Sequence, residues 1–273
     1  MASIFKTRKK PFTAAILLLL GLLMSSPGKS VAQSVGLCYG QVANDLPSPA
    51  EVIDSYKANG IGRMRIFNPN PETLQALRGS NIELIIGVYN DDIENLANNF
   101  TAATNWVQTN IKNYLSDVRF RYIAVGNEIR PLDATTPYVL SAMQNICSAL
   151  ASEEIKLSTM VTLVTRISFA ATMDALYFAL EKAGGANVNI VVSKSGWPST
   201  GNAAATIENA ETYYSNLIKF SKNGTPKRPG YLETYLFAMF DENQKDPAET
   251  EKHFGLFSLP VLFAAVLFTI SQN

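Results

Sequence analysis

The sequence predicts an α/β fold of the (β/α)8 TIM-barrel type that is incomplete, with about one strand and its connections missing. Three observations support this prediction. Apolar strand-like segments alternate with helical segments, as in βαβ units of a parallel sheet. Polar residues stand at the C-terminal ends of several strands, where barrels carry their active sites. Seven strands can be counted, whereas a closed barrel of this type needs eight.

The strands are predicted from short apolar runs. The run at 82–89 is continuous, as in parallel strands that are buried on both faces. In chain order, the predicted strands lie at 35–40, 63–67, 82–89, 120–128, 155–164, 189–194 and 232–242. Between the fifth and the sixth there is room for only one helix, so we expect a gap or distortion of the barrel there.

The helices are predicted from capping residues and apolar spacing. Ser48 is a typical N-cap before Pro49, and Gly60 follows the end of the same helix. Trp106 and Ile111 lie on a helical period within 92–116. In chain order, the predicted helices lie at 48–60, 70–80, 92–116, 137–152, 171–185 and 206–221, and Gly184 and Gly185 stop the fifth.

The composition restricts the function classes. Hydrophobic residues make up 47% and charged residues 17%, which suits a sizeable core. The net charge is zero, so the basic stripe expected of a nucleic-acid partner is missing, and a neutral partner is favoured. His253 is the single histidine, and no metal-binding spacing of His and Cys is found. No metal site is therefore predicted.

The N-terminus resembles a secretory signal. A basic stretch, "MASIFKTRKK", precedes an apolar run and the small residues "SVA" before Gln33. Residues 1–32 are expected to be removed on secretion, and an uncleaved membrane anchor is the alternative. Without the signal no stable membrane span is expected, and the protein is expected to be a monomer in the extracellular space, the cell wall or the vacuole.

Secretion permits disulfides, but the chain has only Cys38 and Cys147. One is expected at a strand end and the other on a helix, layers that lie far apart in a barrel. Two buried free thiols are therefore favoured over one bridge. Asn99 and Asn223 each begin a glycosylation sequon.

Long blocks of the chain resemble plant endo-1,3-β-glucanases of glycoside hydrolase family 17. The matching blocks, which run in order through most of 35–257, are "VGLCYG", "LPSPAEVIDSYKANGIGRMRIF", "QALRGSNIEL", "RYIAVGNE", "ALEKAGG", "SGWPS", "ETYLFAMFDENQK" and "EKHFGLF". The resemblance implies a barrel domain at 33–257 that hydrolyses β-1,3-glucan, such as callose or fungal wall glucan, with retention and without a cofactor. It also implies a role in plant defence.

The resemblance assigns roles to particular residues. Glu128 matches the acid/base of the family, and Lys194 stands where the family has its nucleophilic Glu. Trp197 is expected to line or buttress the sugar cleft. The other matched cleft residues are Tyr39, Asn127, Glu242, Lys245 and Glu251. On spacing alone, Glu242 and Lys245 would form an exposed ion pair.

The chain departs from the family in three places. Lys194 is the first. The second is a stretch on the order of 70 residues, including one strand, which is missing near 165–170. The third is the apolar tail at 258–273, whose twelve-residue apolar run from 259 to 270 is shorter than a membrane span. We interpret the tail as a buried or ill-placed segment, with a lipid-anchor signal as the alternative.

Lys194 is expected to silence the chemistry. A retaining glycosidase needs two carboxyl groups about 5–5.5 Å apart, one as nucleophile and one as acid. A protonated amine is not a nucleophile, and its charge favours the ionised form of Glu128. We expect Lys194 within ion-pair distance of Glu128 and activity lost or much reduced. The alternatives are an inverting role for Glu242 or Glu251, a glucan-binding pseudoenzyme, or a truncated non-functional product.

Overall fold

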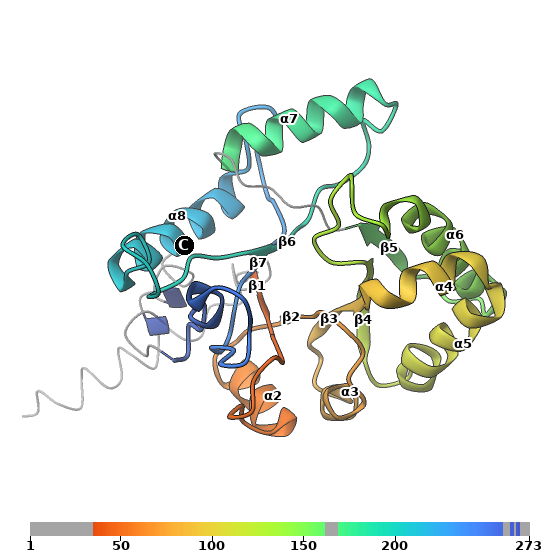
Figure 1. Ribbon diagram of the computed structural model, residues 1–273, viewed down its shortest axis with the longest axis horizontal. Coiled ribbons are helices and arrows are strands. Elements are labelled where there is room, and N and C mark those ends of the chain that lie inside the picture. Colours follow the sequence, from red (N-terminus) through yellow and green to blue (C-terminus); the bar gives the residue numbers. More distant parts are fainter. Residues whose placement is uncertain (1–34, 162–168, 259–262, 265, 268–273) are drawn as a thin grey trace, which may run out of the picture. The chain divides into compact units, whose positions relative to one another are not determined.

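A computed structural model describes residues 35–161, 169–258, 263–264 and 266–267. One compact unit contains all of them. Its centre is a parallel sheet of seven strands in the order β5-β4-β3-β2-β1-β7-β6 (Figure 1). The strands are β1 Val35–Cys38, β2 Arg63–Ile66, β3 Glu83–Val88, β4 Arg119–Val125, β5 Ser158–Val161, β6 Val192–Ser195 and β7 Thr234–Leu236.

The sheet is that of an incomplete (β/α)8 barrel. In a closed barrel every strand has two neighbours, but here β5 and β6 are the two edges of the sheet. The gap therefore lies between the fifth and sixth strands, where the sequence predicted it.

The helices alternate with the strands along the chain. They are α2 Pro49–Ala58, α3 Pro71–Leu77, α4 Ile93–Asn98, α5 Phe100–Asn110, α6 Val139–Ser152, α7 Phe169–Lys182 and α8 Ile207–Asn223. Four 3-10 turns are found at Asn90–Asp92, Lys112–Tyr114, Thr136–Tyr138 and Glu249–Lys252. The start of α2 is capped as predicted, because Ser48 and Glu51 form a reciprocal capping box with Pro49 in the first turn.

The helix predicted at 92–116 is wrong as a single helix. It is broken at Asn99, whose backbone is extended (φ −135°, ψ 102°) and whose side chain accepts a hydrogen bond from the amide of Ala102. Asn99 thus ends α4 and caps α5, a role that short polar side chains favour over a helix interior. The strand predicted at 232–242 is also too long. After Leu236 the regular pairing ends, because the amide of Ala238 donates to the carbonyl of Phe254, although the amides of Phe237 and Met239 still donate to Ser195 and Cys38.

Both cysteines are free, as predicted, but Cys147 is exposed rather than buried. It lies next to Ile146 on α6, outside the face that carries the buried residues of this helix. Its Sγ lies 3.3 Å from Oγ1 of Thr159 on the edge strand β5. Cys147 thus lies beside an edge strand of the sheet.

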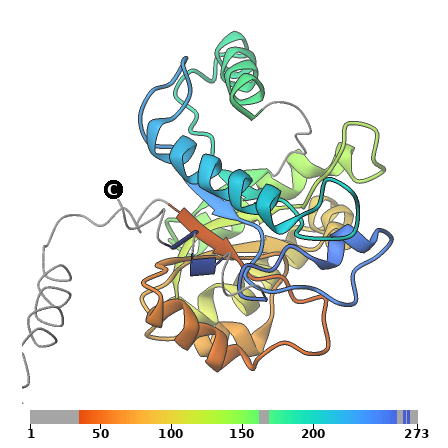
Figure 2. The ribbon, with the colours of Figure 1, turned by 90° about the vertical axis from the view of Figure 1, so that its left-hand side faces the viewer.

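The core is built mainly from β1–β4 and from the helices that cover them. A second cluster, inside the curve of the sheet, contains Cys38, Ile85, Ala124, Tyr235, Phe237 and Ala238. Helix α7 is different, because its buried Met173 contacts only a small cluster with Val192 and Leu232. In Figures 1 and 2 this helix lies apart from α4, α5 and α6, on the side of α8.

Few residues of the apolar tail are described, but they pack. The ring centroids of Phe263 and Phe257 are 3.6 Å apart, and Val266 is buried against the main core. The interpretation of the whole tail as a buried or ill-placed segment stays a prediction, because most of its residues lie outside those described. The signal predicted at 1–32 lies outside the described residues. None of the described helices has the length and apolarity needed to cross a membrane.

Candidate active site

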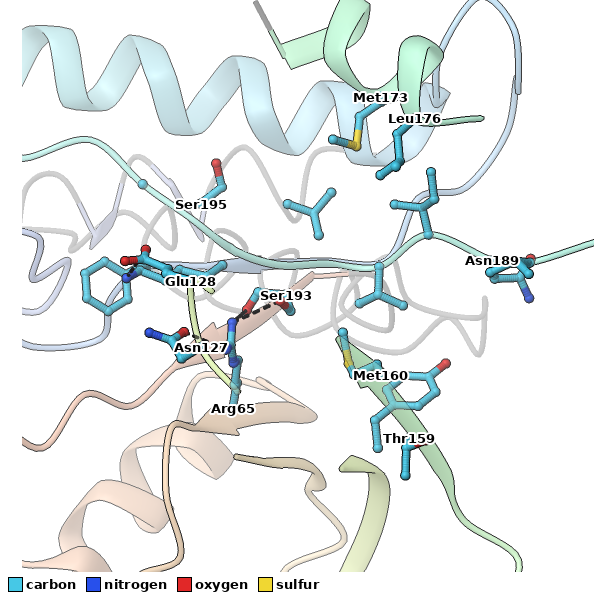
Figure 3. Close-up of a pocket in the computed structure, with 18 of the residues that line it drawn as sticks. Arg65, Asn127, Glu128, Thr159, Met160, Met173, Leu176, Asn189, Ser193 and Ser195 are labelled. Carbon is cyan, nitrogen blue, oxygen red and sulfur yellow. Dashed lines mark hydrogen bonds and ion pairs between the residues drawn. The ribbon is translucent and has the colours of Figure 1, made fainter. Parts of the chain in front are cut away.

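Glu128 and Lys194 meet at the C-terminal ends of β4 and β6. Nζ of Lys194 lies 2.8 Å from Oε1 of Glu128, as predicted from the sequence. Both residues line a cavity of about 940 Å³, together with Arg65, Asn127 and Glu251. Figure 3 shows Glu128 in this cavity with Asn127 and Arg65. Among the described residues, no group of three or more His, Cys, Asp or Glu side chains is arranged for a metal ion.

The backbone of Glu128 is held in an unusual conformation. Its φ is 53°, in the left-handed region that non-glycine residues seldom occupy. Asn90, which follows β3, holds the residue before Glu128, which is Asn127, by two hydrogen bonds. Its side chain donates to the carbonyl of Asn127 at 3.0 Å and accepts from the Asn127 amide at 2.8 Å. Such strain is typical of functional sites, and here it fixes where the carboxylate of Glu128 points.

The charge of Lys194 acts directly on Glu128. Burial alone would raise the pKa of the Glu128 carboxyl, but the ammonium of Lys194 outweighs this, and more distant contributions from Lys245 and Arg65 add to it. The net result is a pKa below the ordinary value. Glu128 is therefore ionised at neutral pH, and one of its oxygens is already occupied by the lysine.

Aromatic rings also support Lys194. Its Nζ lies 4.5 Å from the ring centroid of Phe237 and 5.5 Å from that of Phe67. Nζ of Lys245 lies 4.2 Å from the same Phe237 ring. These distances suit cation–π contacts between the lysine side chains and the aromatic rings.

Arg65 is a site residue that the sequence reasoning missed. Only 1% exposed, it donates from Nη1 to the carbonyl and hydroxyl of Ser193, and from Nη2 to Oδ1 of Asn127. It thus joins the residues that precede Lys194 and Glu128. The available signal was a charged residue between Met64 and Ile66 in a short apolar strand, because a buried charge usually has a specific task.

Glu242 and Lys245 form an ion pair in which Glu242 is buried and Lys245 half-buried, so the exposed pair that spacing alone indicates is not found. Oε2 of Glu242 lies 3.0 Å from Nζ of Lys245, and Oε1 accepts from the amide of Val42 at 3.0 Å. Glu242 is only 3% exposed, because it packs against Gly40, where a Cβ would come within 2.2 Å of the carboxylate. Neither member of the pair lines the cavity of Glu128.

Two other matched residues, Tyr39 and Trp197, are not among the residues that line this cavity. Tyr39 is 3% exposed and meets the ring of Phe240 edge-on, so it is a core residue here. Trp197 packs against Tyr213 with ring centroids 5.5 Å apart, and Tyr213 lines the cavity. Of the two roles considered for Trp197, buttressing is therefore the one that its contacts favour.

Comparisons with known proteins agree with this arrangement. The model of glycosyl hydrolases family 17 matches residues 35–168 and 156–260. A glucan endo-1,3-beta-glucosidase of Vitis vinifera is 44% identical over 331 positions, covering 92% of this chain and 96% of the relative. The acidic isoform GI9 of Nicotiana tabacum is also 44% identical, over 92% of this chain and 95% of its own length.

Solved structures give the same result. CJP38, a beta-1,3-glucanase and allergen of Cryptomeria japonica pollen, is 36% identical, with a TM-score of 0.75 over 82% of this chain and 95% of its own. The alignment to the Vitis relative spans more positions than the 273 residues of this chain, so that relative has an internal stretch that is absent here. The chain belongs to glycosyl hydrolases family 17 and has lost part of the family barrel.

Proposed function

We propose that this chain is a β-1,3-glucan-binding member of its family in which hydrolysis is lost or much reduced. The relatives named glucan endo-1,3-beta-glucosidase support β-1,3-glucan as the ligand and endohydrolysis as the ancestral reaction. The single observation that carries the loss of activity is the 2.8 Å ion pair between Lys194 and Glu128. Cleavage with retention needs two carboxyl groups, and in this pair one of them is replaced by a lysine.

The ion pair removes both halves of the reaction. Cleavage with retention needs a nucleophile that attacks the anomeric carbon, and the ammonium of Lys194 has no free electron pair for this step. Cleavage also needs an acid that gives a proton to the leaving oxygen. Glu128, whose pKa is lowered chiefly by the neighbouring lysine against the opposing effect of burial, has no proton to give at neutral pH.

The other carboxylates offer little replacement. Both oxygens of Glu242 are engaged, one by Val42 and one by Lys245, so this residue is poorly suited to activate a water molecule. Glu251 lines the same cavity as Glu128 and is the better candidate for an inverting base. Loss of a residual activity in Glu251→Gln would identify that role.

The decisive experiment measures laminarin hydrolysis and laminarin binding on the same purified sample. We expect the unaltered chain to bind laminarin, to melt cooperatively, and to release no more reducing sugar than a Glu128→Gln variant. Robust hydrolysis that Glu128→Gln abolishes would overturn the proposal. A chain without a cooperative melt would favour the reading of a truncated product instead.

We further propose that the mature protein is a secreted monomer of the cell wall, the extracellular space or the vacuole. It would consist of a barrel domain at 33–257 and the apolar tail at 258–273, after removal of residues 1–32. The basic stretch and apolar run of the leader support this processing. Mass analysis of the secreted protein should find Gln33 at the N-terminus, and retention of the leader would contradict it.

A further inference from the structure

A second pocket lies towards the end of β6 that is opposite to Lys194. It has a volume of about 310 Å³ and is lined by Tyr177 of α7, by residues 186–189, and by the loop between α8 and β7. Figures 1 and 2 show this loop beside α7. Because residues 186–189 lead into β6 and the loop leads into β7, the pocket lies towards the N-terminal ends of these strands. The candidate active site lies at C-terminal strand ends instead.

The walls of this second pocket are held together by the protein itself. The amide of Thr225 donates to the carbonyl of Arg228 at 3.0 Å, and the amide of Arg228 donates to Oγ1 of Thr225 at 2.9 Å. Nη2 of Arg228 joins the loop to its neighbours, because it donates to Oε1 of Glu181 at 2.9 Å and to the carbonyl of Ala186 at 3.0 Å. A pocket whose walls are fixed in advance loses little conformational freedom when a ligand binds.

The second pocket offers hydrogen bonds rather than charge. Arg228 is the one charged residue among those that line it, and Glu181 already pairs with this arginine. The side-chain amides of Asn187 and Asn189 and the hydroxyls of Tyr177 and Tyr231, in contrast, have no hydrogen-bond partner within the described part of the chain. Both asparagines are exposed, and Tyr231 is 55% exposed, so a ligand can reach them from solvent.

We propose that the second pocket binds one ring of a neutral sugar. An amide presents a donor and an acceptor side by side, so Asn187 matches two neighbouring hydroxyl groups. The ring of Tyr231 offers an apolar face to the C–H groups of the sugar, and its hydroxyl a polar edge. Small-molecule pockets measure about 300–1,000 Å³, so a volume of about 310 Å³ suits a single ring. The site does not rest on the proposed function, because Glu128 and Lys194 take no part in it.

The test is an NMR titration of the full chain, labelled with ¹⁵N and produced without N-glycans, since the sequon of Asn223 adjoins the pocket. The side-chain amide signals of Asn187 and Asn189 are identified by their absence from the spectra of Asn187→Ala and Asn189→Ala. We expect both signals to shift with methyl β-glucoside and to saturate in the millimolar range. Cyclohexanol, a ring with a single hydroxyl group, should shift them far less.

Variants assign the binding to particular side chains. Asn187→Ala should weaken glucoside binding, followed at the Asn189 signal, by about fivefold, because its hydrogen bonds to the sugar are lost. Asn105→Ala, at an exposed position of α5, is the matched control and should change nothing. Tyr231→Ala should weaken binding by a similar factor, whereas Tyr231→Phe, which keeps the ring, should retain most of it. The backbone signals of each variant show whether its fold is unchanged.

Three outcomes would overturn the proposal. The glucoside shifts neither signal, cyclohexanol shifts them as far as the glucoside does, or Asn187→Ala and Asn105→Ala bind the glucoside alike. Asn189 also lines the cavity of Glu128, so a shift of its signal without a shift of the Asn187 signal would place the sugar in that cavity and would overturn the proposal too. Loss of laminarin binding with an unchanged glucoside titration would count against the proposed function instead.

Discussion

The two sides of this barrel differ in how completely they are built. On the side of β1–β4, strands and helices alternate without a break, and Asn90 and Arg65 hold the residues around Glu128 by buried or half-buried hydrogen bonds. On the side of β5 and β6, a strand is missing, α7 packs through a small cluster, and Cys147 is exposed. The site lies where the two sides meet. The hydrogen bonds that hold the residues around Glu128 are therefore intact, although a strand is missing on one side of the site.

The largest expected effect tests whether Lys194 or the missing strand causes the proposed loss of hydrolysis. Lys194→Glu restores a carboxylate opposite Glu128, which supplies a nucleophile and raises the pKa of Glu128 by like-charge repulsion. We expect laminarin hydrolysis to rise at least about a hundredfold, measured as reducing-sugar release. Lys194→Gln, which breaks the ion pair without adding a nucleophile, should gain nothing. A folded, glucan-binding Lys194→Glu variant that stays inactive would place the cause in the missing strand.

The next prediction compares how much stability a buried side chain contributes on each of the two sides. Ile86→Ala in β3 empties a fully buried position of the main core and should lower the free energy of unfolding by about 3 kcal/mol. Met173→Ala in α7 removes a contact from the small cluster and should cost about 1 kcal/mol, because the site can collapse or hydrate. Urea denaturation measures both. Equal losses would show that α7 is as firmly packed as the intact side.

A smaller effect concerns the support of Glu128. Asn90→Ala removes both hydrogen bonds to the backbone of Asn127 and should lower the free energy of unfolding by about 1–2 kcal/mol. Laminarin binding should weaken as well, because these two hydrogen bonds no longer hold the left-handed backbone at Glu128 in place. Asn105→Ala, at an exposed position of α5, is the control. The outcome that contradicts this role is a stability loss without any change in binding.

The smallest expected effect is a pH dependence. The pKa of Glu128 is lower in the folded chain than in the unfolded one, chiefly because Lys194 overcomes the opposing effect of burial. The stabilisation is therefore present above the ordinary carboxyl pKa and is lost as pH falls through the folded pKa. Glu128 is 51% exposed, and screening by water keeps the effect below about 1 kcal/mol. Urea unfolding of the unaltered chain and of Glu128→Gln at pH 7 and pH 3 should show their difference shrinking at the lower pH.

The sequence was most informative where local chemistry dictates structure. Ser48, Pro49 and Glu51 specify the start of α2 by capping alone, and the intact "SGWPS" turn kept Lys194 facing Glu128. The break at Asn99 was missed because apolar spacing continued across it, and only the cap geometry shows that the residue is extended.

Other features depend on tertiary contacts that no spacing reveals. The burial of Glu242 follows from its close packing on Gly40, which lies about two hundred positions away in the chain. The role of Arg65 depends on two segments, around Asn127 and Ser193, that the barrel brings to it. The exposure of Cys147 depends on what packs beside α6, which the spacing of residues in that helix does not reveal.

The open edge strand β6 gives Lys194 a further consequence, for solubility. A closed barrel has no strand edges, but here β5 and β6 each have a side without a neighbouring strand of the sheet. Such edges pair readily with other chains, and natural sheets often prevent this with a lysine or an inward-pointing charge on the edge strand. Lys194 lies within β6. The ammonium group that we propose to prevent glycoside cleavage is thus also placed to oppose edge-to-edge aggregation of the shortened barrel.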